Sequence, residues 1–424
     1  MKDDNLVLGL KRLSGSSVII GQILVIGVIV SMTRAFALTS LFEFLLLILF
    51  LSNRKLRSRF LSSFCDSRVL IPMLFWGWIL LSGVWSIGET RDWLEDFWSW
   101  RKLLLVPYSF VLFENNRSKN ILLWSLVAIA SIFMVASWLG FLGLITLDRP
   151  PEHLLENHAT QGVIFTTSAA IIFLSLNAHS KRFFLVLAIL LIMGFLANNI
   201  FISTGRSAYL FMLVVVTILV FKSIHSKRKW LYSGLVAMTM IIVLGSVDRT
   251  SSRIQQAFNE VQTVYDPDEQ YTSLGIRVIM WTNSLEIVKK HMLLGTGAGG
   301  YRAAYTTEVA GVEGWRGKIV DDPHQQYLHI ASEYGLVGLT LFLLCLVAIL
   351  AGCVSTNTRH TTLILCVLAG TVANGFANGH FSAFVEGRLF WVLCLALQSG
   401  TKDPLFEFLR SKVRRFSIQP EVKD

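Results

Sequence analysis

Twelve apolar segments follow one another along the chain, and most are close to the roughly 20 residues that a helix needs to cross a bilayer. Short polar turns separate them, except for one long stretch at about residues 248–332. We predict an all-α, polytopic membrane protein with a single transmembrane domain, residues 1–424, of about twelve helices. The long stretch, 248–332, would be a large external loop between the ninth and tenth spans. The predicted spans are 17–33, 36–51, 68–86, 102–113, 121–146, 160–178, 183–202, 207–224, 230–247, 333–353, 361–379 and 385–399.

The distribution of positive charge fixes the predicted orientation. Most of the 38 lysines and arginines fall in segments that are cytoplasmic if both termini are inside, as the positive-inside rule requires. The net charge of +10 therefore reflects topology and contact with anionic lipid headgroups rather than nucleic-acid binding. The first apolar segment has no small-residue cleavage site followed by a soluble domain, so we expect it to be retained.

The predicted spans argue against a transporter. Transporters bind substrates and coupling ions near the bilayer midplane with ionisable residues, and here Glu43 is the one clear deep carboxylate. Glu43 is either a proton site or a lone acid held protonated or hydrogen-bonded in the bundle. None of the five cysteines falls in an external segment and no CxxC spacing occurs, so we expect no external disulfide.

The long loop has a pattern of its own. Apolar residues recur at spacings of four and three, which predicts a helix with one apolar stripe: Leu274, Val278, Trp281, Leu285, Val288 and Met292. Such a helix lies on the membrane surface or caps the bundle, and a helix packed on the bundle only for stability is the alternative. The glycine-rich segment 295–301 lacks the Lys-Ser/Thr ending of a P-loop. We expect it to let the backbone approach another element closely.

The sharpest local signal is the run from Asp321 to Leu328. Asp322 suits a helix N-cap, Pro323 the first helical position and Gln325 the third, which predicts a capped helix start. His324 would then lie in the first turn, where the positive end of the helix dipole disfavours imidazolium. A neutral imidazole at the external interface can accept a proton. The alternative is a surface histidine without a catalytic role.

Two arginines are expected at the same face. Arg206 follows Gly205 in a tight external turn, and Arg277 lies on the loop helix beside its apolar stripe. Guanidinium groups bind pyrophosphate bidentately. Anchoring to lipid headgroups is the alternative role for either residue.

At these residues the chain resembles the O-antigen ligase and polymerase superfamily. The motif-bearing part is about residues 200–340, and Gln325 stands where the common family form has Asn. The resemblance is less specific for ligase against polymerase than for the superfamily. The matching features are the Gly205-Arg206 turn, the helix carrying Arg277 and Trp281, the glycine turn near Gly297, and the Pro-His-Gln-Gln-Tyr-Leu run with Glu333 and Gly335 after it.

The resemblance implies a GT-C-like glycosyltransferase of the bacterial inner membrane, inverting, metal-independent and without a cofactor. It implies a donor glycan on undecaprenyl pyrophosphate and a lipid A-core hydroxyl as acceptor, joined at the periplasmic face in lipopolysaccharide biosynthesis. By carry-over, Arg206 and Arg277 bind the leaving pyrophosphate, and His324 deprotonates the acceptor hydroxyl. A polymerase or a protein oligosaccharyltransferase of the same superfamily is the alternative. A glycolipid transporter is the alternative from another class.

Further candidates are weaker. Arg101, Lys102, His158 and Arg388 also fall at the external face; we expect them to anchor at the interface, with contact to pyrophosphate or sugar as the alternative. The sequence 266–268, Asp-Pro-Asp, has the spacing of a metal-binding DxD. Two acids in a polar turn are usually only solvated, so no metal is predicted.

Overall fold

The computed structural model describes residues 15–176, 181–203, 205–246, 273–354 and 358–403, and this part of the chain is helical without strands. A helix occupies each of the twelve segments predicted as spans, because in lipid the backbone must satisfy its own hydrogen bonds. The helices before the external loop are α1 (Ser16–Ser31), α2 (Phe36–Ser52), α3 (Arg54–Ser63), α4 (Ser67–Ser82), α5 (Thr90–Ser99), α6 (Leu105–Leu112), α7 (Asn116–Phe141), α8 (His158–Ser175), α9 (Arg182–Phe201), α10 (Arg206–Ser223) and α11 (Lys229–Ser246). Those of the loop and beyond are α13 (Ser273–Lys290), α14 (Tyr301–Glu308), α15 (Gln326–Val354), α16 (Arg359–Gly375) and α17 (Phe384–Gln398).

The described helices include 6 that are long and apolar enough to cross a membrane, or up to 7 if the bent pair α2 and α3 forms one span. Helix α1 and most of α11 are apolar but shorter. The protein is therefore a multi-pass membrane protein. The count of twelve spans stays a prediction.

Hydrogen bonds and ion pairs join the connections between helices at two separate ends. At one end, Arg34, between α1 and α2, forms an ion pair with Asp148, between α7 and α8. Asn378, between α16 and α17, donates to Ser207 Oγ at the start of α10, at 2.6 Å. We call this the external end, after the predicted topology, and the segment 376–383 that contributes Asn378 the α16–α17 connection.

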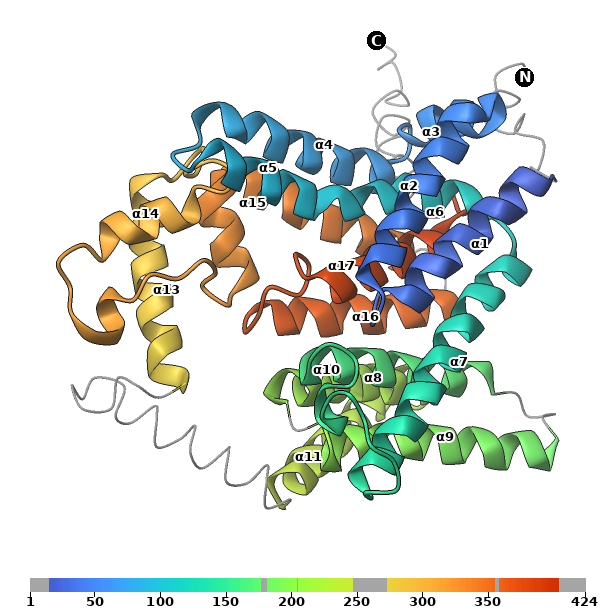
Figure 1. The fold of residues 1–424 in the computed structure, drawn as a ribbon. Helices are drawn as coiled ribbons and strands as arrows, with labels where there is room; N and C mark the ends of the chain where they lie inside the picture. Colours follow the sequence, from blue (N-terminus) through green and yellow to red (C-terminus); the bar gives the residue numbers. More distant parts are fainter. Residues whose placement is uncertain (1–14, 177–180, 204, 247–272, 355–357, 404–424) are drawn as a thin grey trace, which may run out of the picture.

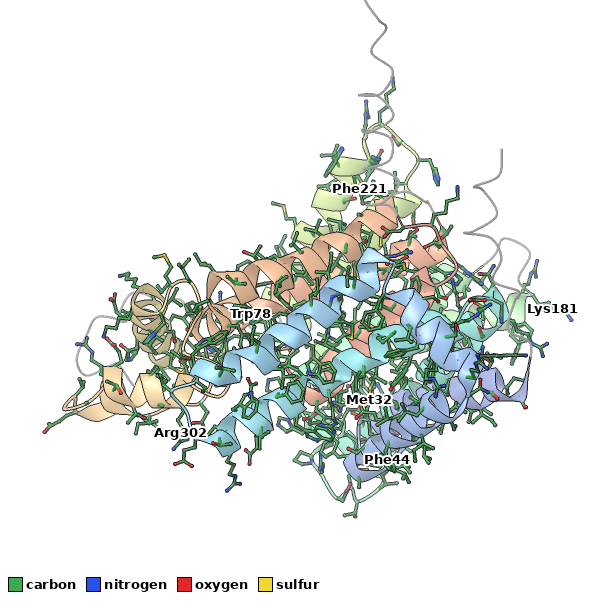
Figure 2. All side chains as sticks on the ribbon, turned by 90° about the horizontal axis from the view of Figure 1, so that it is seen from above. Met32, Phe44, Trp78, Lys181, Phe221 and Arg302 are labelled. Atoms are coloured by element: carbon green, nitrogen blue, oxygen red, sulfur yellow. The ribbon has the colours of Figure 1, made fainter. Side chains whose placement is uncertain are left out.

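Other connections lie at the opposite, internal end. Arg359, at the start of α16, donates to Asn120 Oδ1 near the start of α7, at 2.8 Å. Figure 2 places Arg302, from the external loop, and Lys181, before α9, at opposite tips of the molecule. The connections alternate between the two ends, which agrees with helices that cross one lipid bilayer back and forth.

Helix α17 forms the centre of the bundle. Every side chain from Val385 to Gln398 is buried, and α6 and α16 pack against it. By contrast, α9 and α11 expose large apolar side chains along their length, including Phe183, Leu190 and Ile242. Exposed apolar faces on long helices are typical of lipid contact.

Helix α15 is broken at Gly335, where φ is 67° and ψ is −172°. The break frees main-chain groups that the glycine-rich segment then satisfies: Thr296 N–H donates to Ser332 O at 2.9 Å, and Leu336 N–H donates to Met292 O at 2.9 Å. We call this pairing of residues 292–297 with residues 332–337 the glycine joint. It fixes the external loop to the head of α15 through main-chain atoms.

The expected close backbone approach in the glycine-rich segment is confirmed. Gly295 and Gly297 have φ of 73° and 83°, a region that L side chains rarely adopt. A Cβ at Gly295 would lie 2.3 Å from Glu333 O, and one at Gly297 would lie 2.4 Å from Ser86 Cα. Only glycine allows these contacts.

Helix α13 runs across the external end of the bundle, at a steep angle to α4 and α16 (Figure 1). Its buried face consists of Met280, Ser284 and Ile287. Ile287 belongs to a small apolar cluster with Tyr301 and Tyr305 of α14, and Ser284 Oγ hydrogen-bonds Tyr301 Oη at 2.7 Å. The loop helix thus has a core with α14.

The predicted apolar stripe packs on the protein only in part, and α13 ends at Lys290, before Met292. Leu285 and Met292 are about half exposed, at 49% and 50%, while Trp281 and Val288 are partly buried; the side chain of Leu274 lies outside the described part. The periodicity was right but two faces of this helix carry apolar residues. Leu285 and Met292 are exposed and can contact the membrane surface.

Candidate active site at the external end

His324 lies in a turn just before α15, and its side chain is exposed. Its φ is 54°, and its N–H donates to Asp322 Oδ1 at 2.5 Å. Gln325 Oε1 accepts from Leu328 N–H, which makes Gln325 the helix cap. The predicted helix start, with Asp322 as N-cap and His324 in the first turn, is wrong by three residues, because α15 begins at Gln326.

The physical reason is a competition between two caps. The side chain of an Asp readily accepts from a main-chain N–H two residues on, and this bond turns the chain before the helix can begin. His324 then adopts a left-handed conformation, which histidine tolerates better than most residues. The imidazole therefore projects from a turn to the outside, rather than lying in the first turn of α15.

The loop helix holds this turn from one side. Trp281 Nε1 of α13 donates to Pro323 O at 2.9 Å. Arg277 lies one helical turn before Trp281 on the same helix and is partly buried. The segment that carries Arg277 is thus joined directly to the residue before His324.

The Gly205-Arg206 turn reaches the same place through the α16–α17 connection. Ser207 accepts from Asn378, and at the next residue, Gly379, a Cβ would lie 3.1 Å from Asp322 Oδ2. Arg206 itself is exposed. The structure therefore gathers the segments of all three predicted site residues around the His324 turn.

His158 packs against the Arg206 turn. A Cβ at Gly205 would lie 2.2 Å from the His158 ring, and Ser203 Oγ donates to His158 O at 2.9 Å. Glycine is needed at position 205 because the chain passes directly over an imidazole. His158, partly buried, contributes to the shape of this turn.

A group of acidic and aromatic side chains near the His324 turn was not predicted from the sequence; we call it the His329 group. His329 of α15 has Nδ1 3.9 Å from Asp322 Oδ2 and Nε2 3.5 Å from Glu333 Oε2. Its ring lies edge-on to Tyr301 at 5.2 Å between centroids. The spacing of four between His329 and Glu333 places them on one face of a helix, which is the sequence signal that could have found them.

Asp96 of α5 closes this group from the other side. Its Oδ2 accepts from Tyr334 Oη at 2.7 Å. Burial, and then the neighbouring Glu333 carboxylate, raises the pKa of Asp96 to about 8. At neutral pH the Asp96 carboxyl is therefore largely protonated.

Three of the weaker candidates form a buried charged group instead of anchoring at the interface. Glu43 Oε1 accepts from Arg388 Nε at 2.6 Å, and Glu43 Oε2 accepts from Arg101 Nε at 3.1 Å. Lys102 donates to the carbonyls of Ser382 and Ala383. Arg388 and Lys102 are each 1% exposed. Glu43 is thus not a lone acid, because two guanidinium groups neutralise it.

A second buried polar group lies beside the α16–α17 connection. Glu386 Oε1 accepts from Thr160 Oγ1 at 2.7 Å and lies 3.4 Å from His380 Nδ1. Glu156, in the segment before α8, has φ of 73°, and burial, followed by the Glu386 charge, raises its pKa to about 7. Neither acid stands out in the sequence, since their pairing depends on contacts between distant helices.

Within the described ranges, no three His, Cys, Asp or Glu side chains are grouped so that they could hold a metal ion. The Asp-Pro-Asp sequence at 266–268 lies outside the described residues.

The comparisons with known proteins concern this same part of the chain. The family model of O-antigen ligases matches residues 191–343. This match agrees with the resemblance found in the sequence. Residues 191–343 are thus similar to the O-antigen ligase family. This segment contains the Arg206 turn, α13, the glycine joint and the His324 turn, and members of the family are glycosyltransferase-like enzymes.

One relative extends the similarity beyond the family segment. An uncharacterized protein of Haemophilus influenzae is 24% identical over 344 residues, which cover 77% of this chain and 84% of that protein. The similarity therefore includes bundle helices outside 191–343.

Proposed function

We propose that this protein is an O-antigen ligase, which transfers a glycan from undecaprenyl pyrophosphate to a sugar hydroxyl of lipid A-core at the periplasmic face of the inner membrane. The observation that carries the proposal is the meeting of three segments at one exposed turn. Trp281 joins α13, with Arg277, to Pro323, and Asn378 joins the Arg206 turn to the neighbourhood of Asp322.

In this proposal His324 is the general base. Its exposed imidazole takes the proton of the acceptor hydroxyl, and the acceptor oxygen attacks the anomeric carbon of the donor sugar. The bond from that carbon to the pyrophosphate oxygen breaks, with inversion at the carbon. Arg206 and Arg277 bind the departing pyrophosphate bidentately and balance its charge. No metal is assigned to the step.

The second candidate is a polymerase of the same superfamily, which extends one lipid-linked glycan with another. Both activities need a pyrophosphate site and a base, so the same geometry serves either. The description of the matching family, O-antigen ligase, favours the ligase.

A strain that lacks the gene separates the two activities. If the protein is a ligase, glycans of normal modal length accumulate on the lipid carrier while lipid A-core stays rough. Single repeat units attached to the core would instead identify a polymerase. Normal smooth lipopolysaccharide in that strain would contradict both.

Complementation with variants then tests the base. His324→Ala is expected to lower transfer by at least about 100-fold, the contribution typical of a general base, with normal amounts of folded protein in the membrane. His225→Ala is the matched control, since His225 is exposed between α10 and α11 at the internal end. Near-normal transfer by His324→Ala would remove His324 from the mechanism.

A further inference from the structure

The backbone conformation of His324 is strained, so neighbouring contacts must stabilise it. A non-glycine residue in the left-handed region is strained, and such strain persists only where the surroundings impose it. Asp322 is central here, because one of its oxygens accepts from His324 N–H at 2.5 Å. The position of the Asp322 carboxylate therefore sets the position of His324.

The other oxygen of Asp322 faces His329, at 3.9 Å from Nδ1. The opposite ring nitrogen of His329 lies 3.5 Å from Glu333 Oε2. Glu333 is itself fixed, because its Oε1 accepts from Tyr301 N–H at 3.3 Å and its main chain belongs to the glycine joint. His329 thus connects a rigid acid on one side to the acid that holds His324 on the other.

From these contacts we propose that His329, as imidazolium, is a positioning residue: it holds Asp322 against the fixed Glu333 and thereby holds His324 in its outward, strained conformation. The proposal rests on the proposed function, in which His324 is the base. His329 does not touch substrate in this role; it acts through Asp322.

The charges around His329 are consistent with this role. It faces Asp322, Glu333 and Asp96, and the ring of Tyr301 covers one side. Asp96 is largely protonated at neutral pH, since burial raises its pKa to about 8. Asp322 and Glu333 then remain on either side of the ring, and an imidazolium between them lies within ion-pair distance of both. With a neutral ring, the two acids would lose their common partner, and Asp322 would be free to turn toward water.

Three variants separate positioning from a purely structural role. His329→Gln removes the charge at every pH, and His329→Lys keeps a cation between the two acids. We expect His329→Gln to lower kcat by about 10- to 100-fold with the donor KM within about three-fold of wild type, and His329→Lys to recover part of that loss. His291→Gln, in the external loop after α13, is the control and should leave both constants unchanged.

The pH dependence provides a readout that a structural role would not change. In the wild type, kcat should fall at high pH as His329 loses its proton. In His329→Lys this fall should move to higher pH, and in His329→Gln it should be absent. If His329→Gln keeps wild-type kcat and the same pH profile, the proposal is wrong. If both variants at His329 lower kcat equally with unshifted profiles, the residue is only structural and the proposal is also wrong.

A second measurement does not depend on transfer. The Trp281 indole bonds Pro323 O, so fluorine-labelled tryptophan at 281, assigned with Trp281→Phe, reports the His324 turn by NMR. Its resonance should follow one pH transition in the wild type and lose it in His329→Gln. A lost transition in a protein that transfers no glycan would uphold the positioning role and reject the proposed function. An unchanged transition would reject the positioning role.

Discussion

His324 and Glu156 are, in the part of the chain that the structure describes, the two residues other than glycine with a positive φ, 54° and 73°. Both lie at the external end. Strained backbone conformations gather at functional sites because the rest of the fold must stabilise them. The strain at His324 thus supports a role for this residue that its sequence motif suggested independently.

The conformation of His324 could not be predicted from its neighbours. Asp322, Pro323 and Gln325 each fit a helix start, and the chain offered two capping side chains for one helix. Which cap is used depends on Trp281 and the α16–α17 connection, which lie more than 40 residues away on either side. The pairing of Glu43 with Arg388 was hidden for the same reason.

Replacing Asp96 by Asn should stabilise the protein, and more so at higher pH. The folded state holds a proton on Asp96 up to a pKa of about 8, whereas an unfolded Asp releases it near 4. Stability is therefore lost as pH rises between these values. The gain in unfolding midpoint of Asp96→Asn over wild type should grow from pH about 4 to about 8 and then level off.

Thermal unfolding in detergent, followed by circular dichroism at several pH values, measures this difference. Asn keeps an oxygen that can accept from Tyr334. Glu95→Gln is the control, because Glu95 is exposed and its nearby partner Arg91 is also exposed; its effect should not change across the same range. A gain that shrinks with rising pH would refute the assignment for Asp96.

Among the elements, long apolar stretches were predicted well and the faces of the loop helix were not. A long apolar segment in lipid must satisfy its own backbone hydrogen bonds and is therefore helical, and a helix occupies each predicted span. Helix α13 has apolar residues on two faces, so periodicity could not tell which one packs on α14. From the sequence we expected only a close backbone approach at the glycine-rich segment. Its partner is the main chain at the break in α15, which the sequence pattern does not reveal.

The glycine joint predicts a large effect from a single methyl group. Gly297→Ala places a Cβ 2.4 Å from Ser86 Cα at a φ of 83°, and the strain and overpacking should cost about 2–4 kcal/mol. Gly77→Ala is the matched control, because nothing lies within 4 Å of its Cβ position on α4. It should be neutral or stabilise by up to about 1 kcal/mol.

Unfolding midpoints of the two glycine variants, measured side by side with wild type, decide the matter. Equal midpoints for Gly297→Ala and Gly77→Ala would show that the backbone at residue 297 is not closely packed against Ser86.

At the scale of the whole molecule, three buried polar groups lie on the external side, while Arg68 and Lys119 are buried and paired at the internal end. The Glu43 group, the Glu386 group and the His329 group all involve the α16–α17 connection or the head of α15. Buried charges are costly unless paired, and these three groups lie beside the segments that carry the family motifs, which agrees with a polar site at this face.

The orientation itself can be tested with single cysteines. In a protein with Cys65, the exposed native cysteine, replaced by Ser, Arg302→Cys should react with a membrane-impermeant maleimide in spheroplasts. Lys181→Cys should react only after the membrane is opened. Labelling of both residues in intact spheroplasts, or the reverse pattern, would contradict the predicted topology.

The glycine joint also bears on protein engineering. Because residues 292–297 pair with residues 332–337 through main-chain atoms, the joint does not depend on which side chains surround it. If the external loop is exchanged between related proteins, the exchanged segment should therefore begin inside α11 and end beyond Val337. Both segments of the glycine joint are then transferred together. A graft that ends before Ser332 would bring the His324 turn without the main-chain pairing that aligns it.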